Sequence, residues 1–300
     1  MKNYYEIIDE NKTKSNFVLV GFIVFVSLST YLISYALGSD SSAVVLAVLI
    51  SSLTSLGGFY YSDKIVLAMS GARVATKKEF FNFYTVTENL TKVAGIPMPK
   101  LFVIDDTALN AFATGRDPEH AVICATTGTL QSLTRSELEG VIAHEITHVK
   151  NYDIRLMGLI TVLVGTITLL ADWLLRFNFA GRRKRDEDTG GLGVALFVAG
   201  IIMALLSPII AQLIQLAVSR RREFFADAGS VAITKHPEGL IRALEKISSD
   251  KEPLEVANKA TAHLYISNPL KNRHDSIGWF AGLFNTHPPV KDRIRALQGL

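Results

Sequence analysis

The sequence contains only one cysteine, Cys124, among its 300 residues. A single cysteine excludes an intrachain disulfide and favours a reducing compartment for the domain that contains it. Charged residues are also scarce, at 20% of the chain, and the formal net charge is only +3. The basic residues are dispersed or flank hydrophobic segments, so we expect no nucleic-acid partner. Internal repeats and low-complexity tracts are absent from the sequence as well.

Apolar residues, by contrast, make up 49% of the chain, and the mean hydropathy is +0.27. These values are too high for an ordinary soluble enzyme of one or two domains. The apolar residues gather in four hydrophobic segments, at residues 17–37, 43–61, 156–177 and 192–218. The first segment is uncharged, long enough to cross a bilayer and too long for a cleaved signal peptide. The sequence therefore predicts a multi-pass protein whose partner is the lipid bilayer.

The first two hydrophobic segments are separated by a short turn and predict a transmembrane hairpin. Basic residues lie before and after this hairpin but not in its turn: Lys2, Lys12 and Lys14, then Lys64, Arg73, Lys77 and Lys78. By the positive-inside rule, the N-terminus and the segment after the hairpin face the cytoplasm of the cell membrane. The other two segments are separated by four consecutive basic residues, 182–185. They either span the bilayer fully or form a partly embedded hairpin, and both alternatives stay open.

The remaining residues predict a soluble α+β domain that the second pair of hydrophobic segments divides into two parts. We expect helices at 79–93 and 237–247, a strand at 101–104, and a β-hairpin with strands 110–114 and 121–125. The expected organisation is a transmembrane hairpin at 1–63, a first soluble part at 64–155, a hydrophobic helix pair at 156–218 and a second soluble part at 219–300. The expected fold class is a mainly α membrane protein with an α+β domain and a small sheet.

The most informative motif is His144-Glu145-Ile146-Thr147-His148. A capping-box pattern, with Thr134 at the N-cap and Glu137 three residues later, predicts that the motif lies on a helix. Histidines at i and i+4 project from one helix face and can bind one zinc ion, while Glu145 is placed to take a proton from a water molecule at that ion. The alternative is a surface helix with two solvated histidines, which the apolar flanking residues disfavour.

A hydrolytic zinc site commonly has three protein ligands, so a third donor is needed. The strongest candidate is Glu223, which follows a run of three arginines and lies one helical turn before Asp227. One of these carboxylates could bind zinc while the other accepts a hydrogen bond from a ligating imidazole, a role that Asp153 could also take. Equally, Glu223 and Asp227 could pair with the arginines on a solvated helix face.

Several motifs together resemble the HtpX family of membrane zinc metalloproteases, which are relatives of the CAAX prenyl proteases. They are the N-terminal hydrophobic pair, residues 110–115, the motif at 144–148, residues 221–227, and the terminal His287-Pro288-Pro289 with Arg293. The resemblance implies a gluzincin-like protease domain with one Zn²⁺ per chain. It implies that His144, His148 and Glu223 bind the metal, that Glu145 is the catalytic base, and that Asp227 supports a ligand.

The resemblance also gives roles to residues that the spacing alone does not assign. It implies that an exposed edge strand carrying Asn110, Ala111, Phe112 and Ala113 pairs with an extended substrate. It places His287 and Arg293 as catalytic groups near the oxyanion of the scissile carbonyl. The remaining histidines have no such context and are expected at the surface: His120, His236, His263 and His274.

The predicted function is zinc-dependent hydrolysis of peptide bonds in misfolded or damaged membrane proteins, or in unfolded polypeptides, on the cytoplasmic side. One alternative is a processing protease for lipidated or specific membrane peptides, although four hydrophobic segments are few to enclose an intramembrane chamber. Another is a non-catalytic membrane scaffold with structural zinc. Structural zinc sites usually close with four ligands and favour cysteine, and Cys124 is alone. The sequence assigns no oligomeric state.

Overall fold

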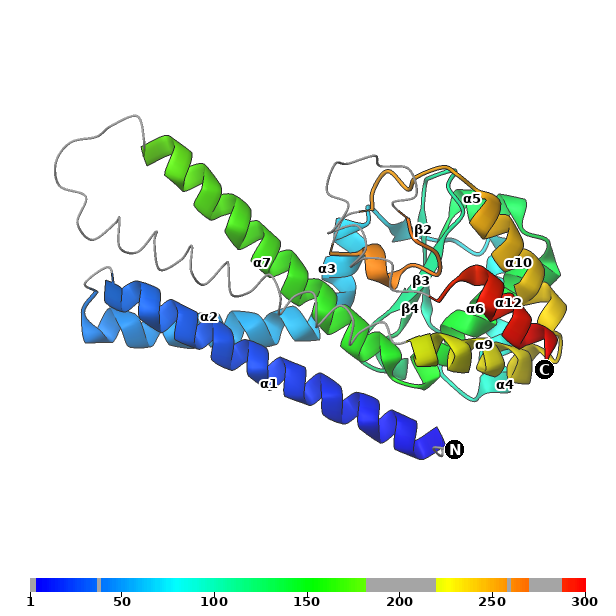
Figure 1. Ribbon diagram of the computed structural model, residues 1–300, viewed down its shortest axis with the longest axis horizontal. Coiled ribbons are helices and arrows are strands. Elements are labelled where there is room, and N and C mark those ends of the chain that lie inside the picture. Colours follow the sequence, from blue (N-terminus) through cyan, green and yellow to red (C-terminus); the bar gives the residue numbers. More distant parts are fainter. Residues whose placement is uncertain (1–3, 37–38, 182–219, 258–259, 270–287) are drawn as a thin grey trace.

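The computed structural model describes residues 4–36, 39–181, 220–257, 260–269 and 288–300 of the chain. Long helices extend away from a body in which shorter helices surround a small sheet (Figure 1). The helices are α1 (Tyr4–Ala36), α2 (Ser41–Tyr60), α3 (Ser62–Met69), α4 (Phe81–Ala94), α5 (Thr127–Ser132), α6 (Arg135–Lys150), α7 (Asp153–Gly181), α9 (Arg220–Thr234), α10 (Pro237–Ser249) and α12 (Val290–Gln298). The strands are β1 (Arg73–Val74), β2 (Lys100–Ile104), β3 (Ala111–Thr114) and β4 (Val122–Thr126), and short 3₁₀ helices lie at Pro118–His120 and Ala262–Leu264.

The sheet has the strand order β1-β2-β4-β3, so that β3 is one of its two edge strands. β4 pairs in parallel with β2 and antiparallel with β3, and the β3–β4 register pairs Ala111 with Ala125 and Thr114 with Val122. The predicted β-hairpin and the predicted strand at 101–104 are therefore confirmed. The turn residue Gly115 has a φ of 139°, which disfavours any residue with a side chain.

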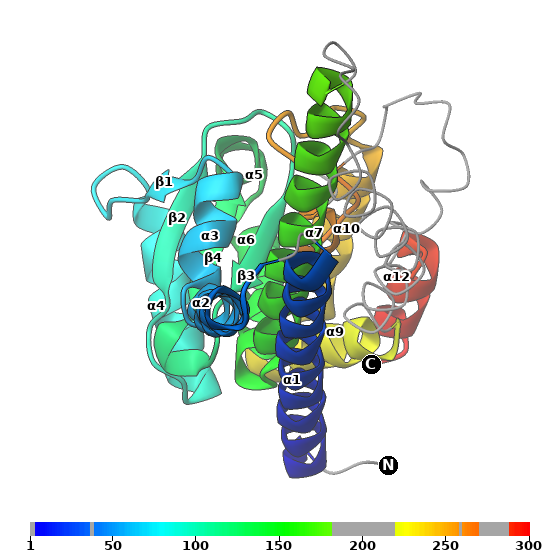
Figure 2. The same ribbon diagram turned by 90° about the vertical axis from the view of Figure 1, so that its left-hand side faces the viewer.

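Both faces of the sheet are covered, because successive side chains of its strands enter two different cores. Leu101, Val103 and Ile123 pack with α4, α6 and α10, whereas Phe112 and Cys124 pack with α3 and α7 on the opposite face. Figure 2 shows the sheet with α3 and α4 on one side of α7, and α9, α10 and α12 on the other. The lone cysteine is thus a small apolar residue of the second core.

Of the four predicted hydrophobic segments, the first two give helices that are long and apolar enough to span a membrane. These spans are Glu6–Leu32 in α1 and Ser41–Tyr60, which is α2. Only 11% and 17% of the residues in one apolar 18-residue stretch of each span are buried within the protein, and large apolar side chains such as Phe17 and Leu53 are exposed. Such surfaces suit contact with lipid, since water solvates them poorly.

The prediction that four such spans exist is not confirmed in the part of the chain that the structure describes. The third hydrophobic segment begins in α7, but its first half is buried in the protein. Leu156, Ile160 and Val164 pack against the sheet, while Leu159 and Leu163 pack against α1 and α2. A sliding hydropathy window cannot separate a core helix from a membrane helix. The fourth segment, at 192–218, and the basic residues at 182–185 lie outside the described residues.

Candidate metal centre

The motif at 144–148 lies on α6, whose start is fixed as the sequence predicts. The Thr134 side chain accepts a hydrogen bond from the Glu137 backbone N–H, and the Glu137 carboxylate accepts one from the Thr134 N–H, which completes a capping box. From Glu137 to Val149 the helix is almost entirely buried. The two histidines are therefore in the interior, which excludes the alternative of a solvated surface helix.

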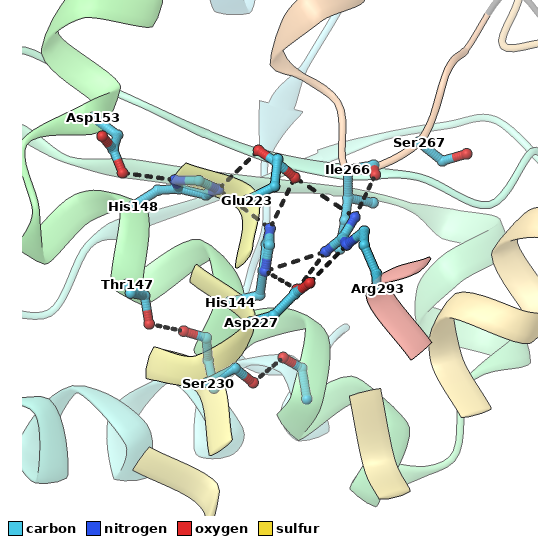
Figure 3. Close-up of polar contacts among 12 residues, drawn as sticks. His144, Thr147, His148, Asp153, Glu223, Asp227, Ser230, Ile266, Ser267 and Arg293 are labelled. Atoms are coloured by element: carbon cyan, nitrogen blue, oxygen red, sulfur yellow. Dashed lines mark hydrogen bonds and ion pairs between the residues drawn. The ribbon is translucent and has the colours of Figure 1, made fainter. Parts of the chain in front are cut away.

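Glu223 of α9 joins the two histidines although 75 residues separate it from His148 in sequence. The Nε2 atoms of His144 and His148 are 3.2 Å apart, and they lie 3.7 and 3.6 Å from the two Glu223 carboxylate oxygens (Figure 3). All three residues are buried, and one donor atom from each can be chosen so that all lie within 4.8 Å of one another. The alternative of a solvated helix face for Glu223 is therefore wrong.

This donor set fits a zinc ion. Zinc binds imidazole nitrogen and carboxylate oxygen at about 2.0–2.2 Å, so neighbouring ligands of a tetrahedral ion lie about 3.3–3.6 Å apart. The Nε2 atoms are 3.2 Å apart, and each lies 3.6–3.7 Å from one of the two Glu223 oxygens, close to that spacing. Two imidazoles and one carboxylate also form the ligand set of many hydrolytic zinc sites. The geometry and chemistry of the residues therefore agree.

Each histidine turns its other ring nitrogen toward a buried carboxylate. His144 Nδ1 lies 3.0 Å from Asp227 Oδ1, and His148 Nδ1 lies 3.0 Å from Asp153 Oδ2. A carboxylate at Nδ1 keeps the proton on that nitrogen, so Nε2 presents its lone pair to a cation. The structure therefore brings Asp227 and Asp153 to the positions that the sequence suggested, one beside each histidine. Asp153 is also the first residue of α7.

The helices α6 and α9 approach one another closely enough to form the cluster because Gly229 has no side chain. A Cβ at Gly229 would collide with the Thr147 Cγ2 atom and lie 2.7 Å from its Oγ1 atom. Close by, the Ser230 hydroxyl donates to the Gly140 carbonyl of α6 at 3.0 Å. On α6 the crossing point at Thr147 is next to His148, and on α9 Gly229 lies two residues after Asp227.

Arg293 lies in the cluster, but its donors are directed at protein groups. Its Nε and Nη2 atoms donate to the two Asp227 oxygens at 2.9 and 2.6 Å, and its Nη1 atom lies 3.4 Å from the Ile266 carbonyl oxygen. Its side chain is 1% exposed. This geometry favours a supporting role for Arg293 over the predicted contact with the oxyanion. The other predicted oxyanion group, His287, lies outside the described residues.

Glu145 is buried beside the ligands, which changes its acidity. Burial raises the pKa of Glu145 to about 7, and Glu223 adds to this rise, whereas His148, Arg293 and a backbone hydrogen bond from Ala113 lower it. A carboxyl group with a pKa near neutral can both accept and release a proton at physiological pH. The buried motif therefore supplies an acid–base group next to the candidate metal ligands.

The two histidines differ in basicity. Burial and the Arg293 charge lower the pKa of His144 to about 4, although Asp227 opposes them. Burial also lowers the pKa of His148, but Asp153, Glu223 and Glu145 outweigh it and raise the value to about 9. The carboxylates thus favour positive charge at His148, and a divalent cation would satisfy the same preference.

The predicted substrate strand is an edge strand, but its edge is not open along its whole length. The Ile266 N–H donates to the Ala111 carbonyl at 2.9 Å, and Asn110 exchanges side-chain hydrogen bonds with the Ser267 backbone at 3.0 and 3.4 Å. Asn110 and all four residues of β3 are buried. The expectation of an exposed strand is therefore wrong at Asn110 and Ala111, because a segment of the chain itself occupies that edge.

The histidines outside the motif follow the prediction in part. His120 and His236 are exposed as expected, whereas His274 lies outside the described residues. His263 is fully buried, so its expected surface position is wrong. Its Nε2 atom lies 3.3 Å from both the Met157 carbonyl and the Thr161 hydroxyl of α7. Those partners come from a distant helix, and a local sequence pattern could not reveal them.

A buried His-Glu-x-x-His helix, a carboxylate from a second helix as the third ligand, and two exposed apolar helices define a membrane-anchored metallopeptidase.

A family model for peptidase family M48 matches residues 77–300. Proteins described as "Protease HtpX homolog" are similar over nearly the whole chain. The one from Dictyoglomus thermophilum is 44% identical over 299 residues, with 98% of this chain and 94% of the relative covered. The one from Streptococcus uberis is 40% identical over 298 residues, covering 98% and 99%.

The chain therefore belongs to peptidase family M48, among its HtpX-type members. The crystal structure of S. mikatae Ste24p has a similar fold, with a TM-score of 0.52 and 17% sequence identity. That comparison covers 96% of this chain and 64% of Ste24p, so the chain spans less than two thirds of that structure. The family implies a metal-dependent peptidase, and the buried cluster is the candidate place for the metal.

Proposed function

We propose that the protein is a multi-pass zinc endopeptidase in which His144, His148 and Glu223 hold the ion. When bound, zinc supplies a Lewis acid that polarises the scissile carbonyl and makes water a stronger acid. Glu145 takes the proton of the attacking water and passes it to the leaving nitrogen. The observation that carries this proposal is the position of Glu145 beside three buried residues whose donor atoms lie within 4.8 Å of one another.

The two halves of the peptidase, residues 64–155 and 219–300, together form the site in this proposal. The first half contributes α6, and the second contributes α9 and α12. The N-terminal hairpin, residues 1–63, anchors the peptidase in the bilayer, and the first half of α7 packs into the peptidase core. Arg293 and Asp227 form the support of His144, and Asp153 forms the support of His148. Extended substrate pairs with β3 either beyond Ala111 or after displacement of the Ile266 segment.

The proposed substrates are misfolded or damaged membrane proteins and unfolded polypeptides, cleaved on the cytoplasmic side. Support for this side comes from the lysines and arginines that flank the hairpin and are absent from its turn. A site close to the bilayer reaches the cytoplasmic loops of neighbouring membrane proteins. An edge strand recognises the peptide backbone with little dependence on sequence, as a protease for unfolded chains requires.

The test of the chemistry is Glu145→Gln in the full-length protein, purified in detergent and assayed with casein. We expect full zinc content and a loss of cleavage of about 10²–10⁴-fold, because the acid–base group is removed. Glu139→Gln is the matched control, since Glu139 lies on the same helix with a side chain that is 37% exposed. Chelator should abolish cleavage by the unmodified protein, and added zinc should restore it. Wild-type cleavage by zinc-loaded Glu145→Gln would refute the proposed role.

The test of the orientation uses membrane vesicles that contain the protein. Inverted vesicles, which expose the cytoplasmic face, should cleave added casein, whereas right-side-out vesicles should cleave it only after detergent is added. The reverse pattern would place the active site on the opposite side of the membrane. A membrane protein with an unfolded cytoplasmic loop, reconstituted in the same vesicles, tests the substrate class directly.

A further inference from the structure

The N-terminal end of α1 makes buried contacts with the peptidase, although α1 is a candidate membrane helix. Asn11 is 3% exposed, and its Nδ2 atom donates to the Asn151 carbonyl at 2.9 Å and to Asp153 Oδ1 at 2.8 Å. Neighbouring residues reinforce this contact, because the Lys12 ammonium lies 4.3 Å from the centre of the Tyr152 ring. Asn11 thus lies in the polar first part of α1, before the hydrophobic segment at 17–37, and its side chain contacts the peptidase.

Asn11 contacts the carboxylate that supports His148. Asp153 receives the Asn11 amide at Oδ1 and faces His148 Nδ1 from Oδ2 at 3.0 Å. One carboxylate thus connects the first helix of the chain with a candidate metal ligand. The Arg222 Nε atom lies 3.9 Å from the same Oδ1, which is beyond hydrogen-bond distance.

The two histidines are supported in different ways. The Asp227 carboxylate beside His144 accepts two hydrogen bonds from the charged guanidinium of Arg293, one on each oxygen. The carboxylate beside His148 receives its short side-chain hydrogen bond from a neutral amide on α1. The support of His148 therefore depends on where the membrane helix lies, whereas the support of His144 comes from within the peptidase.

Asn11 also holds the turn that joins α6 to α7. Its two N–H groups reach Asn151, the C-cap of α6, and Asp153, the first residue of α7. Tyr152 between them has a φ of 60°, an uncommon value for a residue with a side chain. Hydrogen bonds on either side of this residue stabilise a turn that would otherwise relax.

We propose that Asn11 is a positioning residue that fixes Asp153 and, through it, the metal-binding orientation of His148. This inference rests on the proposed zinc site and adds to it a link between the first membrane helix and metal affinity. Outer hydrogen-bond partners of metal-binding histidines typically contribute about 10–100-fold to metal affinity. A displacement of α1 in the bilayer would weaken the site by the same route.

The test measures zinc affinity by chelator competition in the full-length protein in detergent. Asn11→Leu removes the amide, keeps a side chain of similar size and favours the helical conformation. We expect zinc to bind about 10–100-fold more weakly in this variant. Ser15→Ala is the matched control, because Ser15 is also buried on α1 but donates only to its own helix, at the Asn11 carbonyl. This control should bind zinc within about twofold of the unmodified protein, which is the usual variation for a substitution at an independent site.

A double-mutant cycle separates positioning from a general loss of structure. In an Asp153→Ala background, Asn11→Leu should produce a much smaller further loss of zinc affinity, because the partner of Asn11 that faces His148 has gone and only the Asn151 contact remains to be lost. The absorption spectrum of the cobalt-substituted protein should change with Asn11→Leu and stay unchanged with Ser15→Ala. If Asn11→Leu does not yield a monodisperse protein, Asn11→Ala replaces it, with the same expectations.

Equal zinc affinity in the unmodified and Asn11 variants would overturn this inference while leaving the zinc site intact. Additive losses in the double-mutant cycle would overturn it as well. Failure of the proposed function gives a different result, because the unmodified protein would then bind zinc no more tightly than a His144→Ala variant. The two failures are therefore distinguishable in one set of titrations.

Discussion

Arg293 binds Asp227 through two hydrogen bonds, of 2.9 and 2.6 Å, across a separation of 66 residues in the sequence. Both side chains are almost completely buried, and Asp227 also faces the Nδ1 atom of His144 at 3.0 Å. Two parallel N–H···O bonds fix the plane of the carboxylate more firmly than one bond can. The last helix of the chain therefore helps to orient a candidate metal ligand on α6.

Removal of Arg293 should destabilise the protein. Arg293→Ala leaves the buried Asp227 carboxylate without its ion pair, which typically lowers the free energy of unfolding by about 3–5 kcal/mol. The stability of Arg293→Lys should lie between those of the unmodified protein and Arg293→Ala, because lysine keeps the charge and loses the paired geometry. Thermal unfolding in detergent measures the effect. Arg295→Ala is the control, since the Arg295 side chain is 81% exposed. An unchanged melting temperature for Arg293→Ala would contradict the role assigned to this pair.

Proteolysis should decline in acid with the protonation of Glu145. Burial raises the pKa of this carboxyl to about 7. Only the ionised form accepts a proton, so kcat/KM should fall about tenfold per pH unit below the apparent pKa. A bound cation favours the ionised form of Glu145 and therefore moves the midpoint of this decline in kcat/KM below pH 7. The measurement is kcat/KM from pH 5 to 8, and a rate that increases toward pH 5 would contradict it.

Zinc binding at neutral pH should release a proton from His148. Its pKa is raised to about 9 by the surrounding carboxylates, against the effect of burial, so the ring is charged at pH 7 without metal. The ligand form is neutral, hence zinc affinity should increase about tenfold per pH unit from pH 7 and level off above pH 9. Calorimetry in buffers of different ionisation enthalpy counts the protons. His144, whose pKa is lowered to about 4, contributes none, and Glu145, whose pKa is about 7, adds up to about half a proton at pH 7. A total of about half a proton or less would therefore contradict the release from His148.

The crossing of α6 and α9 should tolerate no side chain at Gly229. A Cβ there would lie 2.7 Å from Thr147 Oγ1 and 3.1 Å from its Cβ, so the helices must separate. Gly229→Ala should lower the free energy of unfolding by about 1–3 kcal/mol, the usual effect of overpacking. Zinc affinity should fall with it, because the shift moves Glu223 away from the histidines.

Two further variants make the Gly229 prediction specific. Thr147→Ala removes the two atoms that collide with the new Cβ, so it should partly restore stability in the double variant. Gly21→Ala on α1 is the control, because nothing lies within 4 Å of a Cβ at that position. A Gly229→Ala protein as stable as Gly21→Ala would show that the helices adapt without cost.

Local sequence patterns predicted the elements that depend on local interactions. The capping box at Thr134 defined the start of α6, and short apolar runs, two of them flanking the turn at 115–118, predicted β2 and the β3–β4 hairpin. The amphipathic segment after Pro237 became α10 as expected. These features follow from hydrogen bonds and side-chain periodicity within a few residues, which the sequence contains directly.

Hydropathy was less informative about the third apolar segment. The same apolar composition suits a lipid-facing helix and a core helix, and only the packing of Leu156 and Ile160 against the sheet distinguishes the two. His263 was misplaced for a related reason, since its partners on α7 are 102 and 106 residues away. The residues next to the third apolar segment and to His263 in the sequence do not indicate what surrounds them in the fold.

The sequence by itself determined that two imidazoles and a carboxylate share one helical turn on α6, because the α-helical period places residues four apart on one face. Only the tertiary structure decided which distant groups surround them. Glu223 meets the histidines because α9 crosses α6 at Gly229, and Asn11 reaches Asp153 because α1 docks beside the same turn. Such contacts depend on how helices pack, and packing is a property of the whole chain rather than of any segment.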